Sequence, residues 1–134
     1  MPPHELPILG SPEDWLRHAH SDLELARLNL PAGVLLEDLC FHAQQAAEKA
    51  LKAVFVAGKI SSPRTHSIRM LIDLIPEDLD VPQSVQDASA LTDYAVLSRY
   101  PGNLEPIEVD EYREAVALAE AVVKWSMAMV ARLS

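Results

Sequence analysis

The stretch from Cys40 to Gly58 constrains the fold more than any other part of the chain. It reads CFHAQQAAEKALKAVFVAG, with no proline and with its only glycine at the end. Alanine, leucine, glutamine, glutamate and lysine are strong helix formers, so local propensity favours one continuous helix. Gly58 suits the C-terminal stop of this helix, because glycine adopts a left-handed conformation at little cost.

Apolar residues recur every three or four positions along this stretch, which marks one buried side of a helix. They are Leu36, Leu39, Ala43, Ala47, Ala50 and Val54. Phe41, Ala46, Leu51 and Phe55 add apolar surface on other sides. A helix that is apolar over much of its circumference normally lies at the centre of a bundle. The alanines would let neighbouring helices approach it closely.

The rest of the chain also favours an all-α protein. Only four glycines occur, and most prolines fall between the periodic runs, whereas a sheet protein would need many more turn signals. We expect helices over residues 12–30, 35–57, 66–75, 82–97 and 108–132. Four long helices and one additional short helix, joined by short connections, predict an up-and-down four-helix bundle. Residues 1–10 contain three prolines and are expected to form a flexible arm, and residues 11–134 a single domain.

The last predicted helix carries two apolar stripes, which is more than one neighbouring helix can cover. The second stripe consists of Leu118, Val122, Trp125 and Met129. It is either ordinary bundle core or the surface of a dimer.

Several observations concern the location of the protein. No apolar run approaches the roughly 20 residues needed to cross a bilayer, so no membrane association is expected. The N-terminus lacks the basic start and the long apolar stretch of a secretory signal. The single cysteine, Cys40, can form no internal disulfide, which fits a reducing compartment. We therefore expect a cytoplasmic protein.

The charge of the chain is strongly acidic, with a formal net charge of -9. Such a surface repels nucleic acid in general, because phosphate binding relies on basic side chains. The segment from Lys49 to Ile72, however, contains five Lys and Arg residues and no acid. This segment is either a solvated basic surface or a local anion site on an otherwise acidic protein.

Most motifs that carry chemistry are missing from the sequence. There is no glycine-rich phosphate loop, no nucleophile elbow, no zinc-type Cys/His spacing and no di-iron E-x-x-H pair. Asp14, His18 and Asp22 share one face of the first helix, but three ligands on one exposed helix side rarely hold a metal. Cys40 falls within a core pattern and is expected to be a buried thiol. We predict neither a metal nor a cofactor.

One group of polar residues remains that a bundle could bring together. The second helix contributes His42, Gln44, Gln45, Glu48, Lys49 and Lys52. The turn that follows it adds Arg64, Thr65 and His66, and the end of the fourth helix adds Arg99 and Tyr100. Arginine is a rigid donor fork suited to phosphate, and a tyrosine can stack on a base or pack in the core. His66 is either a ligand contact or a structural turn residue. Spacing alone does not choose between these interpretations.

The run Ala43-Gln44-Gln45-Ala46-Ala47-Glu48-Lys49-Ala50-Leu51-Lys52-Ala53 resembles the signature of HEPN domains. Thr65-His66-Ser67-Ile68 is similar to the family's histidine-containing start of a short helix, and Tyr94 through Arg99-Tyr100-Pro101 to its Tyr…Arg-Tyr-Pro turn. The resemblance covers roughly residues 12–133. It implies a helical bundle, usually a homodimer, similar to the C-terminal helical domain of kanamycin-type nucleotidyltransferases. Such small proteins are often encoded beside a minimal nucleotidyltransferase, and many of these pairs are toxin–antitoxin systems.

Some HEPN proteins are metal-independent ribonucleases that carry an arginine followed by a histidine after four to six residues. Here Arg99 matches the arginine, but the corresponding positions hold Leu104, Glu105 and Pro106, and no histidine follows His66. The ribonuclease motif is therefore incomplete.

The resemblance and the residues together predict a homodimeric module that binds a nucleotide or a nucleotidyltransferase partner. The incomplete ribonuclease motif argues against an enzymatic activity of its own. The predicted contacts are Lys49, Lys52, Arg64, His66, Arg99 and Tyr100. One alternative is a ribonuclease toxin that acts on RNA through Arg99 and His66. The other is a dimerisation scaffold with no small ligand.

Overall fold

The computed structural model describes residues 6–28, 33–97 and 106–133, and within these ranges it contains helices and no strand. The elements are α1 (Pro12–Ala26), α2 (Leu36–Ala57), α3 (Ile68–Asp73), the 3-10 turn η1 (Glu77–Leu79), α4 (Gln83–Gln86), the 3-10 helix η2 (Asp87–Asp93), α5 (Tyr94–Leu97) and α6 (Val109–Leu133). The predicted all-α fold is confirmed.

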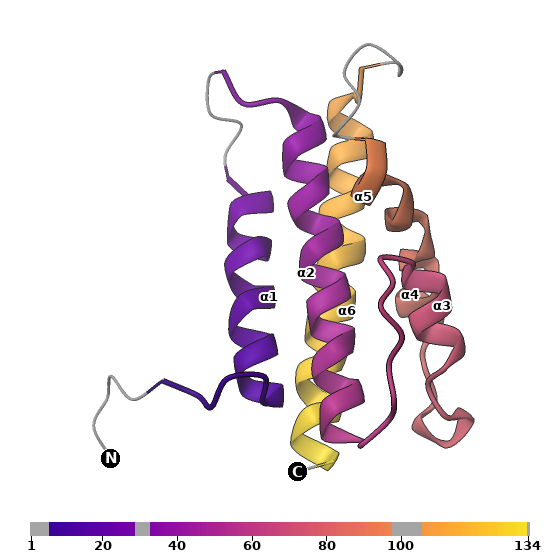
Figure 1. Cartoon of the computed structure of the whole chain (residues 1–134). Helices are drawn as coiled ribbons and strands as arrows, with labels where there is room; N and C mark the ends of the chain where they lie inside the picture. The colour runs from indigo at the N-terminus through magenta and orange to yellow at the C-terminus, as the bar shows by residue number, and fades with distance from the viewer. Residues whose placement is uncertain (1–5, 29–32, 98–105, 134) are drawn as a thin grey trace.

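The chain runs up and down as a bundle (Figure 1). Helix α1 rises, α2 descends beside it, and α6 descends behind α2. Between α2 and α6 the chain rises again through α4, η2 and α5, which together form the fourth member of the bundle, while α3 is the additional short helix. Helix α2 packs extensively against both α1 and α6, so it is the central element that its alanine pattern predicts.

Helix α1 begins where the sequence predicts and ends early. The Ser11 side chain accepts a hydrogen bond from the Asp14 amide at 3.1 Å, and Pro12 occupies the first turn. The helix ends at Ala26, so the predicted extent of 12–30 was too long. The Tyr112 hydroxyl of α6 donates to the carbonyl oxygen of Ala26 at 2.5 Å, with the Leu28 carbonyl 3.3 Å away, and so satisfies the last carbonyl of the helix.

Helix α2 matches its predicted extent, but its C-terminus differs from the expectation for Gly58. Gly58 has φ -86°, and the left-handed residue is Lys59 with φ 56°. The Ile60 amide donates to the Phe55 carbonyl at 2.8 Å and the Lys59 amide to Val56 at 3.2 Å, which is a Schellman motif displaced by one residue. A Cβ on Gly58 would lie 3.1 Å from the Cδ1 atom of Ile60, so a larger residue here would require the Ile60 side chain to shift by a few tenths of an ångström.

The core is built around the alanines of α2. Ala43, Ala46, Ala47, Ala50 and Ala53 are all fully buried. The second apolar stripe of α6 also packs within the single chain: Val122 and Met129 are buried, and Leu118 and Trp125 are half-buried against the core. This stripe is therefore bundle core rather than a free dimer surface.

The fourth predicted helix is not one continuous α-helix. Residues 82–97 form α4, η2 and α5, with seven residues in 3-10 geometry. The buried residues Val85, Ala88 and Leu91 are spaced by three, which matches the three residues per turn of a 3-10 helix. The Thr92 hydroxyl also accepts from the Ile68 amide at 3.0 Å and ties η2 to the start of α3.

Helix α3 is shorter than the predicted range 66–75. It begins at Ile68, after Ser67, whose hydroxyl accepts from the Met70 amide at 3.1 Å. His66 therefore precedes the helix rather than starting it. The predicted core positions Ile68, Leu71, Ile72 and Ile75 are all buried. In the described ranges, the helices lack the combination of length and apolar character that a membrane crossing requires.

Candidate functional site

A polar stripe runs along α2 between α1 and the segment 59–67. In Figure 1 this segment rises beside α2 on the side away from α1. The stripe consists of His42, Gln45, Lys49 and Lys52, four half-buried side chains at helical spacing. We call these four residues, together with Asp22 and Glu48, which contact them, and His66, which contacts Glu48, the α2 face. It spans about 15 Å along the helix axis, since each residue adds about 1.5 Å.

The first cluster on this face surrounds Asp22 of α1, which is only 7% exposed. One carboxylate oxygen lies 3.0 Å from Nδ1 of His42, and the other accepts from Nζ of Lys49 at 2.6 Å. Because an ionised carboxylate only accepts hydrogen bonds, His42 carries a proton on Nδ1. The cluster joins α1 to α2 through a buried charge that has two donors.

The second cluster surrounds Glu48, which is 4% exposed. Its Oε1 atom lies 2.8 Å from Nδ1 of His66 and accepts from Nε2 of Gln44 at 3.1 Å, while Oε2 lies 3.3 Å from Nζ of Lys52. The fully buried Gln44 also donates to the His66 carbonyl at 3.2 Å. These bonds fix the His66 segment against α2.

The two clusters repeat one arrangement, in which a buried carboxylate holds one lysine and one histidine. Each histidine uses Nδ1, so its Nε2 atom is not engaged by the carboxylate. His66 is the more exposed of the two, with 60% of its side chain accessible against 32% for His42. The Lys52 ammonium also lies 5.5 Å from the centre of the Trp15 ring, within the range of a cation–π interaction.

The structure brings together Lys49, Lys52 and His66 of the predicted contacts. Arg64 lies on the same segment as His66, is exposed, and forms no ion pair with the described residues. Arg99 and Tyr100 fall outside the described residues. Glu48 belongs to the polar group that the sequence predicts for the second helix. Sequence reasoning did not place Asp22 with that group, although Asp22 holds both Lys49 and His42.

Asp14 and Asp22, which share one face of α1, contact different partners and do not converge on one point. Asp14 accepts from the Gly10 amide at 3.0 Å and from Arg17 at 2.9 Å, and these two bonds lower the pKa of the Asp14 carboxyl. Asp22 instead turns to α2, as described above. No group of three or more His, Cys, Asp or Glu residues in the described ranges is arranged to hold a metal ion.

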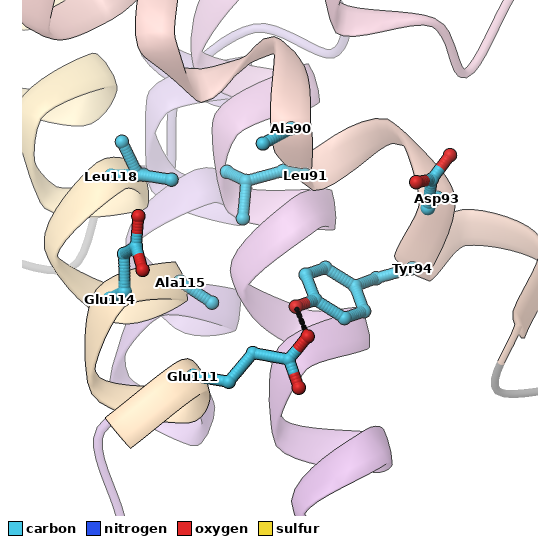
Figure 2. Close-up of a pocket in the computed structure, with 8 residues that line it drawn as sticks. All are labelled: Ala90, Leu91, Asp93, Tyr94, Glu111, Glu114, Ala115 and Leu118. Atoms are coloured by element: carbon cyan, nitrogen blue, oxygen red, sulfur yellow. Dashed lines mark hydrogen bonds between the residues drawn. The ribbon is translucent and has the colours of Figure 1, made fainter. Parts of the chain in front are cut away.

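A pocket of about 300 Å³ lies elsewhere, between η2, α5 and the N-terminal half of α6 (Figure 2). It is lined by Ala90, Leu91, Asp93, Tyr94, Glu111, Glu114, Ala115 and Leu118. The Tyr94 hydroxyl donates to Glu111 at 3.1 Å, and burial is the main cause that raises the pKa of Tyr94. Three carboxylates and no cation line this pocket, so it is unsuited to phosphate. None of its residues was predicted as a contact.

Cys40 is fully buried in the core. Burial, followed by the nearby charges of Glu111 and Glu37, raises the pKa of the Cys40 thiol to about 12. The thiol therefore stays protonated near neutral pH and is no nucleophile.

Comparison with known proteins identifies relatives of this bundle. The model of the HEPN domain matches residues 12–130. The crystal structure of TT1696 from Thermus thermophilus is 33% identical, with a TM-score of 0.79, over 90% of this chain and 99% of that one. The structure of ST0689, an archaeal HEPN homologue, is 27% identical, with a TM-score of 0.63, over 92% of this chain and 98% of that one. No curated protein gives a significant match.

Proposed function

The chain belongs to the HEPN-domain family, and from this premise we propose that it acts in the cytoplasm as a binding module for a nucleotide. The nucleotide phosphates would contact the α2 face and the adjacent turn that carries Arg64 and His66. The observation that carries the proposal is the convergence of two lysines and two histidines around two buried carboxylates on one side of α2.

The lysines of this face retain donors for a ligand. An ammonium group has three N–H donors, and Lys49 and Lys52 each direct one toward a buried carboxylate. The carboxylates fix the direction of both side chains, which reduces the entropy that a ligand would otherwise lose in ordering them. Arg64 adds a guanidinium with no ion-pair partner in the described residues.

Calorimetric titration with ATP and GTP tests the proposal directly. In Lys52→Gln we expect affinity to fall by about tenfold, because a hydrogen bond to a charged group is worth about 1.5–3 kcal/mol. Lys124→Gln, which alters an exposed lysine on α6, is the matched control and should change affinity less than about twofold. The absence of heat with millimolar nucleotide would refute the nucleotide proposal.

The proposal includes assembly, for which the family resemblance is the support. We propose that two copies pair as a homodimer and that the module works beside a minimal nucleotidyltransferase, as in a toxin–antitoxin pair. Light scattering on the purified chain measures its oligomeric state. Co-expression with the nucleotidyltransferase of a neighbouring gene measures the complex. A monomer that never co-purifies with that protein would refute this part.

A ribonuclease is the second candidate function, and one observation favours it. Glu48 holds Nδ1 of His66 and leaves Nε2 free, which is how a carboxylate orients a histidine that exchanges protons. Incubation with RNA in EDTA tests it, because metal-independent cleavage survives chelation. We expect intact RNA under the binding-module proposal. Cleavage that is lost in both Arg99→Ala and His66→Ala would instead establish the ribonuclease.

A further inference from the structure

The charges of the α2 face cancel when its histidines are neutral. Asp22 and Glu48 contribute two negative charges, and Lys49 and Lys52 two positive ones. Arg64 lies beside this balanced set on a chain whose formal net charge is -9. The net charge of such a face therefore attracts an approaching phosphate only weakly, although each lysine still offers N–H donors at close range.

The two imidazoles are the groups that can change this balance. Each already places Nδ1 against a carboxylate, so a second proton binds at the free Nε2 atom. The charged groups that face His42 are Asp22 from α1 and, through the same carboxylate, Lys49. Those that face His66 are Glu48 and, through it, Lys52, with the neutral amide of Gln44 adjacent. Protonation of both histidines would give the face a surplus of two positive charges.

We infer that nucleotide binding at the α2 face is coupled to proton uptake by His42 and His66, so that affinity rises as pH falls. This inference rests on the proposed nucleotide-binding function. A bound phosphate that accepts from Nε2–H stabilises the protonated imidazole, and by linkage the proton stabilises the bound phosphate equally. Each proton taken up changes affinity by at most about tenfold per pH unit.

The direction in which affinity changes with pH distinguishes proton uptake by the protein from protonation of the ligand. A terminal phosphate gains its own proton near pH 6, and this removes negative charge from the ligand. Protonation of the ligand therefore weakens binding at low pH. An affinity that rises as pH falls must come from groups on the protein.

The test is calorimetric titration of the full chain with ATP at pH 6, 7 and 8, in two buffers of different ionisation enthalpy. The difference in heat between the buffers gives the number of protons taken up. We expect about 0.5–2 protons near pH 7 and an affinity that rises at least about fivefold from pH 8 to pH 6. In His42→Gln and His66→Gln the uptake should fall, because glutamine can donate to the carboxylate but cannot bind a second proton.

His20→Gln is the matched control. His20 lies on α1, where its Nε2 atom contacts the Met127 sulfur of α6, away from both carboxylate clusters. Its replacement should leave proton uptake unchanged. The buffer comparison on the unaltered chain does not depend on whether any variant folds.

The outcomes distinguish this inference from the proposed function. Binding with the same affinity at all three pH values and no proton uptake would overturn the coupling and leave the nucleotide function intact. Tighter binding at pH 8 than at pH 6 would also overturn it. Absence of binding at every pH would overturn both.

Discussion

Replacement of Glu48 by glutamine removes the charge at the centre of the second cluster and keeps the shape of the side chain. The carboxylate is buried and has three donors, from Gln44, Lys52 and His66. The substituted amide can still accept from Gln44 and His66 through Oε1, but its NH₂ group now faces the Lys52 ammonium, which is also a donor. The Glu48→Gln substitution therefore tests the contribution of the charge while the packing of the side chain stays the same.

The expected loss of stability follows from these contacts. Hydrogen bonds to a charged group exceed neutral ones by roughly 1 kcal/mol each. Lys52 and His66 are partly exposed and regain hydration, and the desolvation cost of the buried charge disappears, so the losses do not add in full. We expect the free energy of unfolding to fall by about 1–2 kcal/mol. For 134 residues this lowers Tm by about 4–7 °C.

The same substitution should have the opposite effect on nucleotide binding. The substitution removes one negative charge from the α2 face, whose positive and negative charges otherwise cancel. At roughly 6 Å from a phosphate and an effective dielectric constant of about 40, one charge is worth about 1.4 kcal/mol. We therefore expect Glu48→Gln to bind ATP about three- to tenfold more tightly at low salt.

Urea denaturation and calorimetric titration measure the two effects. Asp38→Asn, an exposed acid in the first turn of α2, is the control and should change stability by less than about 0.5 kcal/mol. An unchanged free energy of unfolding in Glu48→Gln would show that the cluster contributes nothing to the fold. Weaker ATP binding in a folded variant would refute the charge argument for the α2 face.

Three further predictions concern the core. Tyr112→Phe removes the hydroxyl that joins α6 to the end of α1 and should cost about 1–2 kcal/mol in urea denaturation, whereas an unchanged midpoint would contradict this role. Ser126→Ala should raise the free energy of unfolding by about 0.5–2 kcal/mol, because the buried hydroxyl has no hydrogen-bond partner among the described residues; a lower Tm would count against this. Cys40 ionises more readily in the unfolded chain, where its pKa is near 9, than in the fold, where it is about 12. Stability should therefore fall by about 1.4 kcal/mol between pH 8 and pH 10 relative to Cys40→Ala, and identical pH profiles of the two proteins would refute the shift.

The sequence predicts the long helices well because their evidence is local. Helix α2 was expected over 35–57 and extends over Leu36–Ala57, since propensity and apolar period agree along its whole length. The end of α1 was missed because its last carbonyl bonds to Tyr112, which lies 86 residues away from Ala26 in the chain. The 3-10 geometry of η2 was missed because residues spaced by three fit an α-helix almost as well.

The candidate site was predictable only in part. Helical spacing places Lys49 and Lys52 on one side of α2, and the short connection to α3 brings His66 to the same region. The partner of Lys49 is Asp22 on another helix, so the sequence around Lys49 does not indicate that its charge is neutralised. The acidic pocket of Figure 2 arises where α6 packs against η2 and α5, and its lining residues carry no shared sequence signal.

The acid-free run that begins at Lys49 therefore overstates how basic this surface is, because Asp22 and Glu48 neutralise the lysines from within the bundle. Stability alone gives little reason to bury these acids, since an apolar pair of similar volume often serves as well or better. Each carboxylate does fix the direction of one lysine and one imidazole while it links α2 to a neighbouring segment. Without these carboxylates, the lysine and histidine side chains would be free to rotate. The buried acids are thus best understood as groups that fix the direction of these side chains on α2.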